Sequence, residues 1–260
     1  MIRSINPASG AVIAEYNEFD SARVEAILGD VAYAFSAWQS TSFSTRLKLM
    51  KNVSEILRSN SEQFACLMAE EMGKPLAEGV AEAEKSAWVC DYYAENAEEF
   101  LADKLIDAGA DKSYVSFRPL GAVLAVMPWN FPFWQVFRFA APNLMAGNVG
   151  VLKHASNVCG CSLAIEEIFQ QAGFPENVFR SLLVPGSRVQ ELIASPVIKA
   201  VTLTGSTPAG KSIASHSGSN LKKSVLELGG SDPYVVLADA DLDLAASKCV
   251  ISRLINSGQS

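Results

Sequence analysis

The loop Pro128-Trp-Asn-Phe-Pro132 contains a polar side chain whose surroundings suit chemistry. It follows the apolar run GAVLAVM at residues 121–127 and brackets one amide with two aromatic rings and two prolines. Because proline restricts the backbone and aromatic rings anchor a loop, we expect Asn130 to be held rigidly. A fixed amide donor can stabilise a developing oxyanion. A structural turn with a capping asparagine is the alternative interpretation.

A single carboxylate, Glu227, lies inside the apolar run Val225-Leu-Glu-Leu-Gly-Gly230. Such a glutamate can be a surface residue of a strand. It can also be a general base that is partly removed from water and therefore has a raised pKa. The spacing of the residues leaves both interpretations open.

Residues 205–212, GSTPAGKS, match the phosphate-binding pattern G-x-x-x-x-G-K-[ST] and follow the apolar run at 200–204. The apolar segment 234–239 ends in an aspartate, as the Mg²⁺-binding strand of nucleotide triphosphatases does. A nucleotide triphosphatase of the P-loop type is therefore one candidate function.

The local chemistry of GSTPAGKS also fits a different anion site. Ser206 or Thr207 can cap a helix and Pro208 can lie in its first turn, so the helix would begin too early for a P-loop. Pro208 also removes an N–H group from the loop that would bind phosphates. A strand, a glycine that allows close approach and a helix N-terminus are instead typical of a pyrophosphate site.

Two kinds of periodicity predict the elements that position these residues. Up to about residue 102 the apolar residues recur at helical spacing, and from Pro119 short apolar runs alternate with helical segments. The second pattern is typical of βαβ units and a parallel sheet, so the predicted class is α/β. The N-terminal elements that we expect are helices over 20–39, Ser44–Met72 (with Ser44 or Thr45 as its N-cap) and Leu76–Ala102, and a strand over Lys112–Arg118.

The loops after the strands are where a ligand is expected. Parallel strands joined by right-handed crossovers bring these loops to one edge of the sheet, and ligands of such folds bind there. That edge should collect four segments: Pro128–Pro132, Lys153–Asn157, Pro185–Gly186 and Gly205–Ser206.

Composition narrows the classes of partner. The 260 residues have a formal net charge of −7 and a pI near 5.0, which argues against a surface that neutralises nucleic-acid phosphates. The sequence has no run of about 18 apolar residues that could span a bilayer, and no signal-peptide core near its start. We therefore expect a cytoplasmic protein that binds neither nucleic acid nor membrane. Five cysteines and two histidines without ligand spacing predict no disulfide framework and no metal site.

The motifs taken in order resemble the aldehyde dehydrogenase superfamily over essentially the whole chain. They are INPASG near the start, EEMGKP at 70–75, FRPLG at 117–121, PWNFP at 128–132, LK at 152–153, TLTGS at 202–206, LELGGSDP at 226–233 and GQS at 258–260. The segments PWNFPFWQVFR, LKHASN and LELGGSDP are most similar to those of the bacterial NAD(P)-dependent succinate-semialdehyde dehydrogenases. Taken together, the order and spacing of the motifs argue against a P-loop fold.

The resemblance implies a domain plan. Residues 1–227 would form N-terminal helices and a Rossmann-type NAD(P)-binding domain, and residues 228–260 would begin a catalytic domain that is incomplete here. The strand at 112–118 would contribute to oligomerisation, so a homodimer or homotetramer is expected of the intact protein.

The resemblance also implies roles for individual residues. In the family a cysteine thiolate attacks the aldehyde, the matching asparagine (Asn130) stabilises the oxyanion, and the matching glutamate (Glu227) activates the water that hydrolyses the thioester. The positions that would contact NADP or NAD are Met127, Pro128, Trp129, Lys153, Ser156, Gly186, Thr204, Gly205, Ser206, Leu228 and Gly229.

Two positions bear on specificity. NAD-preferring relatives carry a glutamate where this chain has Ser156, so we expect a 2′-phosphate to be accommodated and NADP to be used at least as well as NAD. Arg138 matches the arginine that binds the carboxylate of succinate semialdehyde, the expected aldehyde substrate. A salt bridge on the helix surface is the alternative role of Arg138.

Residues 258–260 fill the first three positions of the family motif G-Q-x-C, so the nucleophile is expected one residue beyond Ser260. None of the five cysteines lies where the family places it. We therefore expect a cut or incompletely described chain that binds dinucleotide and oxidises no aldehyde by itself. A non-catalytic dinucleotide-binding protein stays open as the other alternative.

Overall fold

The computed structural model describes residues 1–259, and its centre is a parallel sheet of five strands. The strand order is β7-β6-β5-β8-β9, and every neighbouring pair is parallel. The predicted α/β class and Rossmann-type sheet are therefore confirmed. The strands are β5 (Ala122–Met127), β6 (Val149–His154), β7 (Phe179–Ser181), β8 (Ile198–Gly205) and β9 (Lys223–Leu228).

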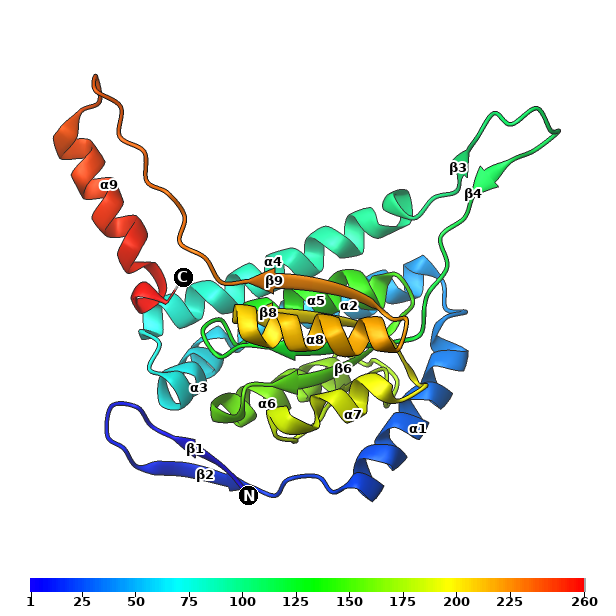
Figure 1. Cartoon of the computed structure of the whole chain (residues 1–260), viewed down its shortest axis with the longest axis horizontal. Helices are drawn as coiled ribbons and strands as arrows, with labels where there is room; N and C mark the ends of the chain where they lie inside the picture. Colours follow the sequence, from blue (N-terminus) through cyan, green and yellow to red (C-terminus); the bar gives the residue numbers. More distant parts are fainter. Residues whose placement is uncertain (260) are drawn as a thin grey trace.

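Helices cover this sheet on both faces. Figure 1 shows α8 in front of the sheet, with α4 and α5 behind it. The helices are α1 (Ser21–Trp38), α2 (Phe43–Ser59), α3 (Ser61–Met72), α4 (Leu76–Phe100), α5 (Trp134–Met145), α6 (Cys159–Gln171), α7 (Val189–Ala194), α8 (Thr207–Ser219) and α9 (Leu242–Leu254). Three short turns of 3₁₀ type are η1 (Ser156–Val158), η2 (Gly186–Arg188) and η3 (Ile255–Gly258).

The core lies between the central strands and α5. Leu124 of β5, Val151 of β6 and Phe137 of α5 are fully buried, and α5 in turn packs against α4. Each central strand is buried on both faces, which explains the continuous apolar runs in the sequence. None of the helices within residues 1–259 is both long and apolar enough to cross a bilayer.

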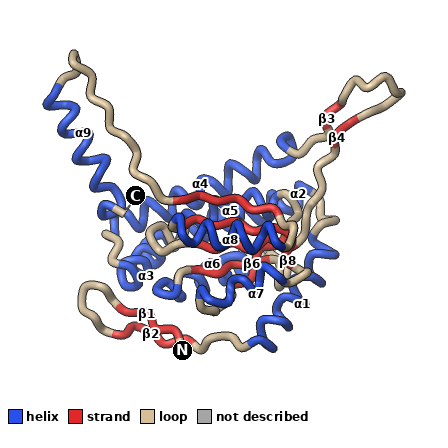
Figure 2. Tube along the Cα trace, in the orientation of Figure 1, coloured by secondary structure: helices blue, strands red, loops and turns tan. Residues whose placement is uncertain are grey.

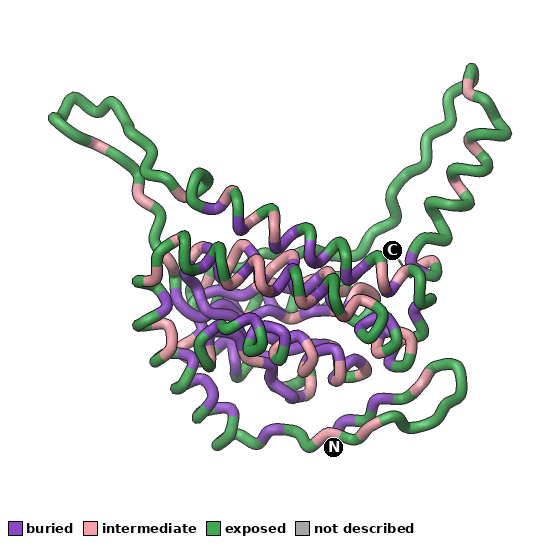
Figure 3. The backbone as a smooth tube through the Cα atoms, turned by 180° about the vertical axis from the view of Figure 1, so that it is seen from behind, coloured by how far each residue is buried: buried purple, intermediate pink, exposed green. Residues whose placement is uncertain are grey.

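Two hairpins and one long segment project from this body. Figure 2 shows the hairpin of β3 (Lys104–Leu105) and β4 (Tyr114–Val115) on one side, and the segment after β9 on the other. The hairpin of β1 (Ile2–Ile5) and β2 (Val12–Tyr16) lies below the sheet. Most of these projections are exposed, in contrast to the buried sheet (Figure 3).

Two sequence predictions about the N-terminal part were wrong in detail. The helix predicted over Ser44–Met72 is two helices, because the chain leaves helical geometry at Asn60, whose side chain donates to the Ile56 carbonyl at 2.9 Å. Its N-cap is Ser42, whose hydroxyl accepts from the Thr45 N–H at 3.1 Å. The helix predicted over Leu76–Ala102 is confirmed as α4.

The strand predicted over Lys112–Arg118 is much shorter. Only Tyr114 and Val115 are extended and paired, and their partners are Leu105 and Lys104. The alternating side chains of this segment meet no other strand within residues 1–259, so they have no second partner that would extend the ladder.

Candidate active site

The direction of the sheet connections reverses between β5 and β8. From β5 the chain continues to β6 and β7 on one side, and then crosses to β8 and β9 on the other. In open parallel sheets the crevice at the carboxyl ends of the strands, at such a reversal, is the usual ligand site. The structure brings the four predicted loops to this edge, since they follow β5, β6, β7 and β8.

Asn130 lies three residues beyond the end of β5 and is half-buried. Its Nδ2 donates to the carbonyl oxygen of Gln259 at 2.6 Å, and its own carbonyl accepts from Asn256 Nδ2 at 2.9 Å. Met127 is buried at the end of β5, and Trp129 is partly exposed beside Asn130. The amide of Asn130 is therefore directed toward the turn η3.

The residues after Asn130 are anchored from two sides. Glu82 of α4 accepts hydrogen bonds from the N–H groups of Phe133 and Trp134 at 2.8 and 2.9 Å. On the other side, His154 Nε2 lies 2.9 Å from the carbonyl oxygen of Pro132. The residues that follow Asn130 are thus held by buried side chains of α4 and β6, which the prolines and aromatics of the loop did not indicate.

His154, the last residue of β6, is buried and neutral. Its Nδ1 accepts the N–H of Ala155 at 2.9 Å, so the proton resides on Nε2 and is donated to Pro132. Burial lowers the pKa of His154 to about 4, because it disfavours the charged imidazolium. This histidine connects the loop after β5 to the loop after β6.

Lys153 places an ammonium group near the end of β6. Lys153 is 7% exposed, and burial lowers the pKa of its ammonium group. No carboxylate within residues 1–259 forms an ion pair with Lys153. Ser156, three residues after Lys153, begins η1 and is exposed, and Gly186 is exposed at the start of η2. A cation without an acidic partner, next to an exposed hydroxyl, suits a ribose or a phosphate.

The motif GSTPAGKS folds as a helix and not as a phosphate-binding loop. Ser206 caps α8 by accepting the N–H of Ala209 at 3.4 Å, and Pro208 lies in its first turn, which places Lys211 in its second. Gly210 serves packing, since a Cβ there would lie 2.4 Å from Leu228 Cδ2 on β9. Residues 234–239 form no strand. Nothing in these contacts supports a nucleotide triphosphatase.

Arg138 of α5 lies beside the ends of β8 and β9. Its Nη2 donates to Thr204 Oγ1 at 3.2 Å, and its Nη1 is 4.0 Å from Glu227 Oε2. The register pairs Thr204 with Glu227 and Gly205 with Leu228, and the Gly229 N–H donates to the Gly205 carbonyl at 3.2 Å. The substrate and base candidates therefore meet at one point.

Of the two interpretations of Glu227, the surface residue fits the described chain. Its side chain is 59% exposed and lies on a strand at the edge of the sheet. The structure shows no contact between Glu227 and Asn130 among residues 1–259: Arg138 links Glu227 to Thr204, whereas the hydrogen bonds of Asn130 are to Gln259 and Asn256.

The comparison with known proteins decides the family. The model of the aldehyde dehydrogenase family matches residues 1–260. The chain belongs to the aldehyde dehydrogenase family.

Individual relatives agree with this assignment. The chain is 51% identical to the probable succinate-semialdehyde dehydrogenase [NADP(+)] of Synechocystis sp. and 46% identical to succinate-semialdehyde dehydrogenase [NADP(+)] 1 of Mycobacterium tuberculosis. Both matches cover the whole chain but 57% of the relative, so the chain spans little more than half their length. A succinic semialdehyde dehydrogenase from Streptococcus pyogenes, solved with NADP+, superposes with a TM-score of 0.96 at 34% identity, over 100% of this chain and 57% of that one.

The cysteines of this aldehyde dehydrogenase chain do not suit nucleophilic attack where they are buried. Burial raises the pKa of Cys159 to about 11, and it also raises the pKa of Cys90 and of Cys161, so these thiols stay protonated near neutral pH. All five cysteines are free. Residues 1–259 contain no group of three histidine, cysteine or acidic side chains arranged to hold a metal ion.

Sequence reasoning missed the buried polar residues behind the site. Glu82, its partner Lys74 and Glu71 are each at most 4% exposed, and His154 was considered only as a possible metal ligand. A signal for Glu82 was present, because it lies on the same helical stripe as Gly79, Ala83 and Ser86, which is the face that α4 buries.

Proposed function

We propose that the full-length protein oxidises succinate semialdehyde to succinate with NADP, and that this chain supplies the dinucleotide site, the oxyanion donor and the general base. The observation that carries the proposal is the sheet reversal between β5 and β8, which collects the Asn130 loop, Lys153 and the N-terminus of α8 at one edge. Support comes from the family membership and from relatives whose names specify this aldehyde and NADP(+).

The residues at this edge fit NADP. Lys153 offers a cation without an acidic partner among residues 1–259, and the first N–H groups of α8 can bind phosphate. Ser156 brings no negative charge to the ribose position, so a 2′-phosphate would meet an ammonium and a hydroxyl. When bound, the nicotinamide accepts the hydride that leaves the substrate.

The other positions predicted to contact the dinucleotide would surround this cofactor. Gly186 and Gly205 leave space at the ends of β7 and β8, because a Cβ would meet nothing within 4 Å at Gly186 and only Leu203, at 3.4 Å, at Gly205. The remaining contacts that we propose are those of Met127, Pro128, Trp129, Thr204, Ser206, Leu228 and Gly229, all at strand ends or directly after them.

Asn130 and Glu227 have the chemistry that the reaction needs. The Nδ2 of Asn130 donates to a carbonyl oxygen, and the same donor could serve an oxyanion. The exposed carboxylate of Glu227 is free to accept a proton from water during hydrolysis of the thioester. The buried thiols of this chain are not the nucleophile in this proposal, because their raised pKa keeps them protonated.

Arg138 would bind the distal carboxylate of the substrate. Its guanidinium is half-exposed and its contact with Glu227 is long, at 4.0 Å, so donors remain for a carboxylate of the ligand. For assembly we propose a homodimer or homotetramer that uses the β3–β4 hairpin, where Leu105 and Ile106 are exposed. The boundary near residue 227 would separate the cofactor domain from the catalytic domain.

Steady-state kinetics of the full-length enzyme tests the proposal. We expect kcat/KM to be highest with succinate semialdehyde and NADP, and lower with butanal, which has the same length without the carboxylate. A large preference for NAD would overturn the cofactor assignment. NADP binding without turnover of any aldehyde would instead support a non-catalytic dinucleotide-binding protein.

A further inference from the structure

A buried ion pair lies directly behind the loop that carries Asn130. Lys74, in the turn between α3 and α4, contacts Glu82 Oε2, and the two side chains are 1% and 2% exposed. Removing two charges from water is unfavourable, and apolar residues of similar volume are often at least as stabilising at such a place. The pair therefore calls for an explanation other than the stability of the helices.

The second oxygen of Glu82 performs a specific task. Helix α5 begins without a side-chain cap of its own, and Glu82 Oε1 accepts the N–H groups of Phe133 and Trp134 instead. This contact joins residues that are 51 and 52 positions apart in the chain. A carboxylate at a helix N-terminus is also favoured by the helix dipole.

Lys74 contacts the same loop directly. Its Nζ lies 4.3 Å from the ring centroid of Phe131, the residue after Asn130. The loop is therefore held at Phe131 by the ammonium and at Phe133 by the carboxylate, while His154 holds Pro132 between them. Within residues 1–259, the hydrogen bonds of Asn130 are to Asn256 and Gln259, so within its own loop the orientation of Asn130 depends on the anchoring of Phe131, Pro132 and Phe133.

We propose that Glu82, held by Lys74, is a positioning residue that orients the amide of Asn130 for the oxyanion. The inference rests on the proposed function, because it concerns the donor of that reaction. Displacing a catalytic group by about 1 Å can slow an enzyme about a hundredfold. Loss of the Glu82 acceptor should therefore lower kcat and leave the affinity for NADP unchanged.

Glu71 provides a matched comparison on the neighbouring helix. Its two carboxylate oxygens accept the N–H groups of Gly160 and Cys161, each at 2.8 Å, at the start of α6. It is as buried as Glu82, but it supports the loop of Lys153 and Ser156 and not that of Asn130. Replacing Glu71 should therefore raise KM for NADP more than it lowers kcat.

The decisive experiment compares two double variants of the full-length enzyme, K74M/E82Q and K74M/E82M. Both remove the two charges and keep the side-chain volumes, but only glutamine retains an oxygen that accepts from Phe133 and Trp134. We expect K74M/E82Q to keep kcat within about threefold and K74M/E82M to lose roughly tenfold to a hundredfold, with KM for NADP similar in both. Equal kcat values in the two variants would overturn the proposal.

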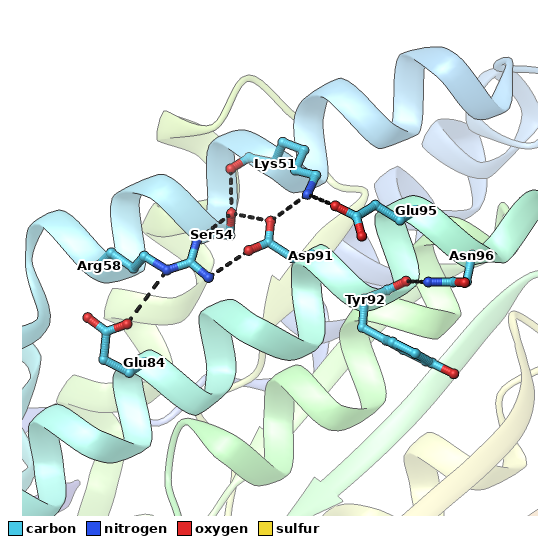
Figure 4. Close-up of polar contacts among 8 residues, drawn as sticks. All are labelled: Lys51, Ser54, Arg58, Glu84, Asp91, Tyr92, Glu95 and Asn96. Atoms are coloured by element: carbon cyan, nitrogen blue, oxygen red, sulfur yellow. Dashed lines mark hydrogen bonds and ion pairs between the residues drawn. The ribbon is translucent and has the colours of Figure 1, made fainter.

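Three further variants make the outcome unambiguous. Asn130→Ala tests the proposed function itself, because a variant with full kcat would contradict the oxyanion assignment. If Asn130→Ala loses kcat but the two double variants have equal kcat values, only the role of Glu82 is rejected. Glu71→Gln should shift KM for NADP. Lys51→Met disrupts the more exposed contacts with Asp91 and Glu95 between α2 and α4 and should leave kcat unchanged (Figure 4).

A milder variant applies if K74M/E82M does not fold. Phe131→Leu removes the ring beside Lys74 and leaves no polar group unsatisfied. We expect it to lower kcat several-fold without a change in KM for NADP, and an unchanged kcat would reject the positioning role.

Discussion

The two catalytic candidates lie in regions of very different construction. The loop of Asn130 follows a strand that is buried almost throughout, and buried side chains of α4 and β6 hold the residues after it. Glu227 lies on β9, none of whose residues is buried, and α9 beyond it contains no buried residue either. Figure 3 shows this difference between the buried sheet and the exposed segment after it.

This contrast shows which part of the candidate site is positioned by contacts within residues 1–259. Asn130 is placed by packing and hydrogen bonds within residues 1–259. In the described part of the chain, Glu227 has one charged neighbour, Arg138 at 4.0 Å, besides its backbone pairing with Thr204. We therefore expect changes in the buried residues that hold the Asn130 loop to affect stability and activity together, and changes near Glu227 to affect activity with little effect on folding.

Truncation of one apolar side chain in each region should show the contrast most strongly. Leu152 of β6 is fully buried, so Leu152→Ala should lower the free energy of unfolding by about 2–5 kcal/mol. Val225 of β9 is 62% exposed, and Val225→Ala should change the free energy of unfolding by less than about 0.5 kcal/mol. Denaturant unfolding measures both, and similar losses would remove the distinction between the regions.

Removal of the amide should separate activity from stability at the anchored loop. Asn130→Ala in the full-length enzyme should lower kcat roughly 10²- to 10³-fold, which is about 3–4 kcal/mol of transition-state stabilisation. The melting temperature should change little, because the loop keeps its contacts at Phe133 and Pro132. A kcat within twofold of the unmodified enzyme would contradict the proposed role.

The buried His154 predicts a pH dependence of the free energy of unfolding, and this dependence arises in the region that holds the Asn130 loop. The pKa of His154 is lowered from 6.5 to about 4 in the native state, so the unfolded chain binds the proton first as pH falls. Stability should therefore decrease between pH 6.5 and 4, by up to about 3 kcal/mol from this group.

His154→Gln should remove that decrease, because glutamine can donate to Pro132 without titrating. Thermal unfolding at a series of pH values measures the effect. His216→Gln on α8 is the control and should keep the decrease of the unmodified protein. The same slope in His154→Gln would assign it to other groups.

The smallest expected effect concerns the exposed side of the site. Arg138→Leu should raise KM for succinate semialdehyde on the order of tenfold and leave KM for butanal nearly unchanged. Lys211→Met, which removes a cation from the second turn of α8, is the control. Equal changes for the two aldehydes would favour the alternative in which Arg138 forms only a surface salt bridge.

Much of the fold was predictable because its signals are local. The apolar runs at β5 and β8, the helical stripes of α1 and α4 and the cap at Ser206 each depend on a few consecutive residues. The break at Asn60 was not predictable, since the apolar pattern continues across it. The strand at Lys112–Arg118 was overestimated, because alternation says nothing about whether a partner strand is present.

The family, the order of the elements and the loops that follow the strands could be assigned from the sequence, because motifs, capping, proline placement and hydrophobic periodicity each involve only a few consecutive residues. The tertiary structure decided what holds the site. Glu82 reaches Phe133 across 51 residues, Arg138 reaches Thr204 across 66, and His154 reaches Pro132 across 22. Such contacts depend on how helices cross the sheet, and that geometry is set by the packing of the whole core.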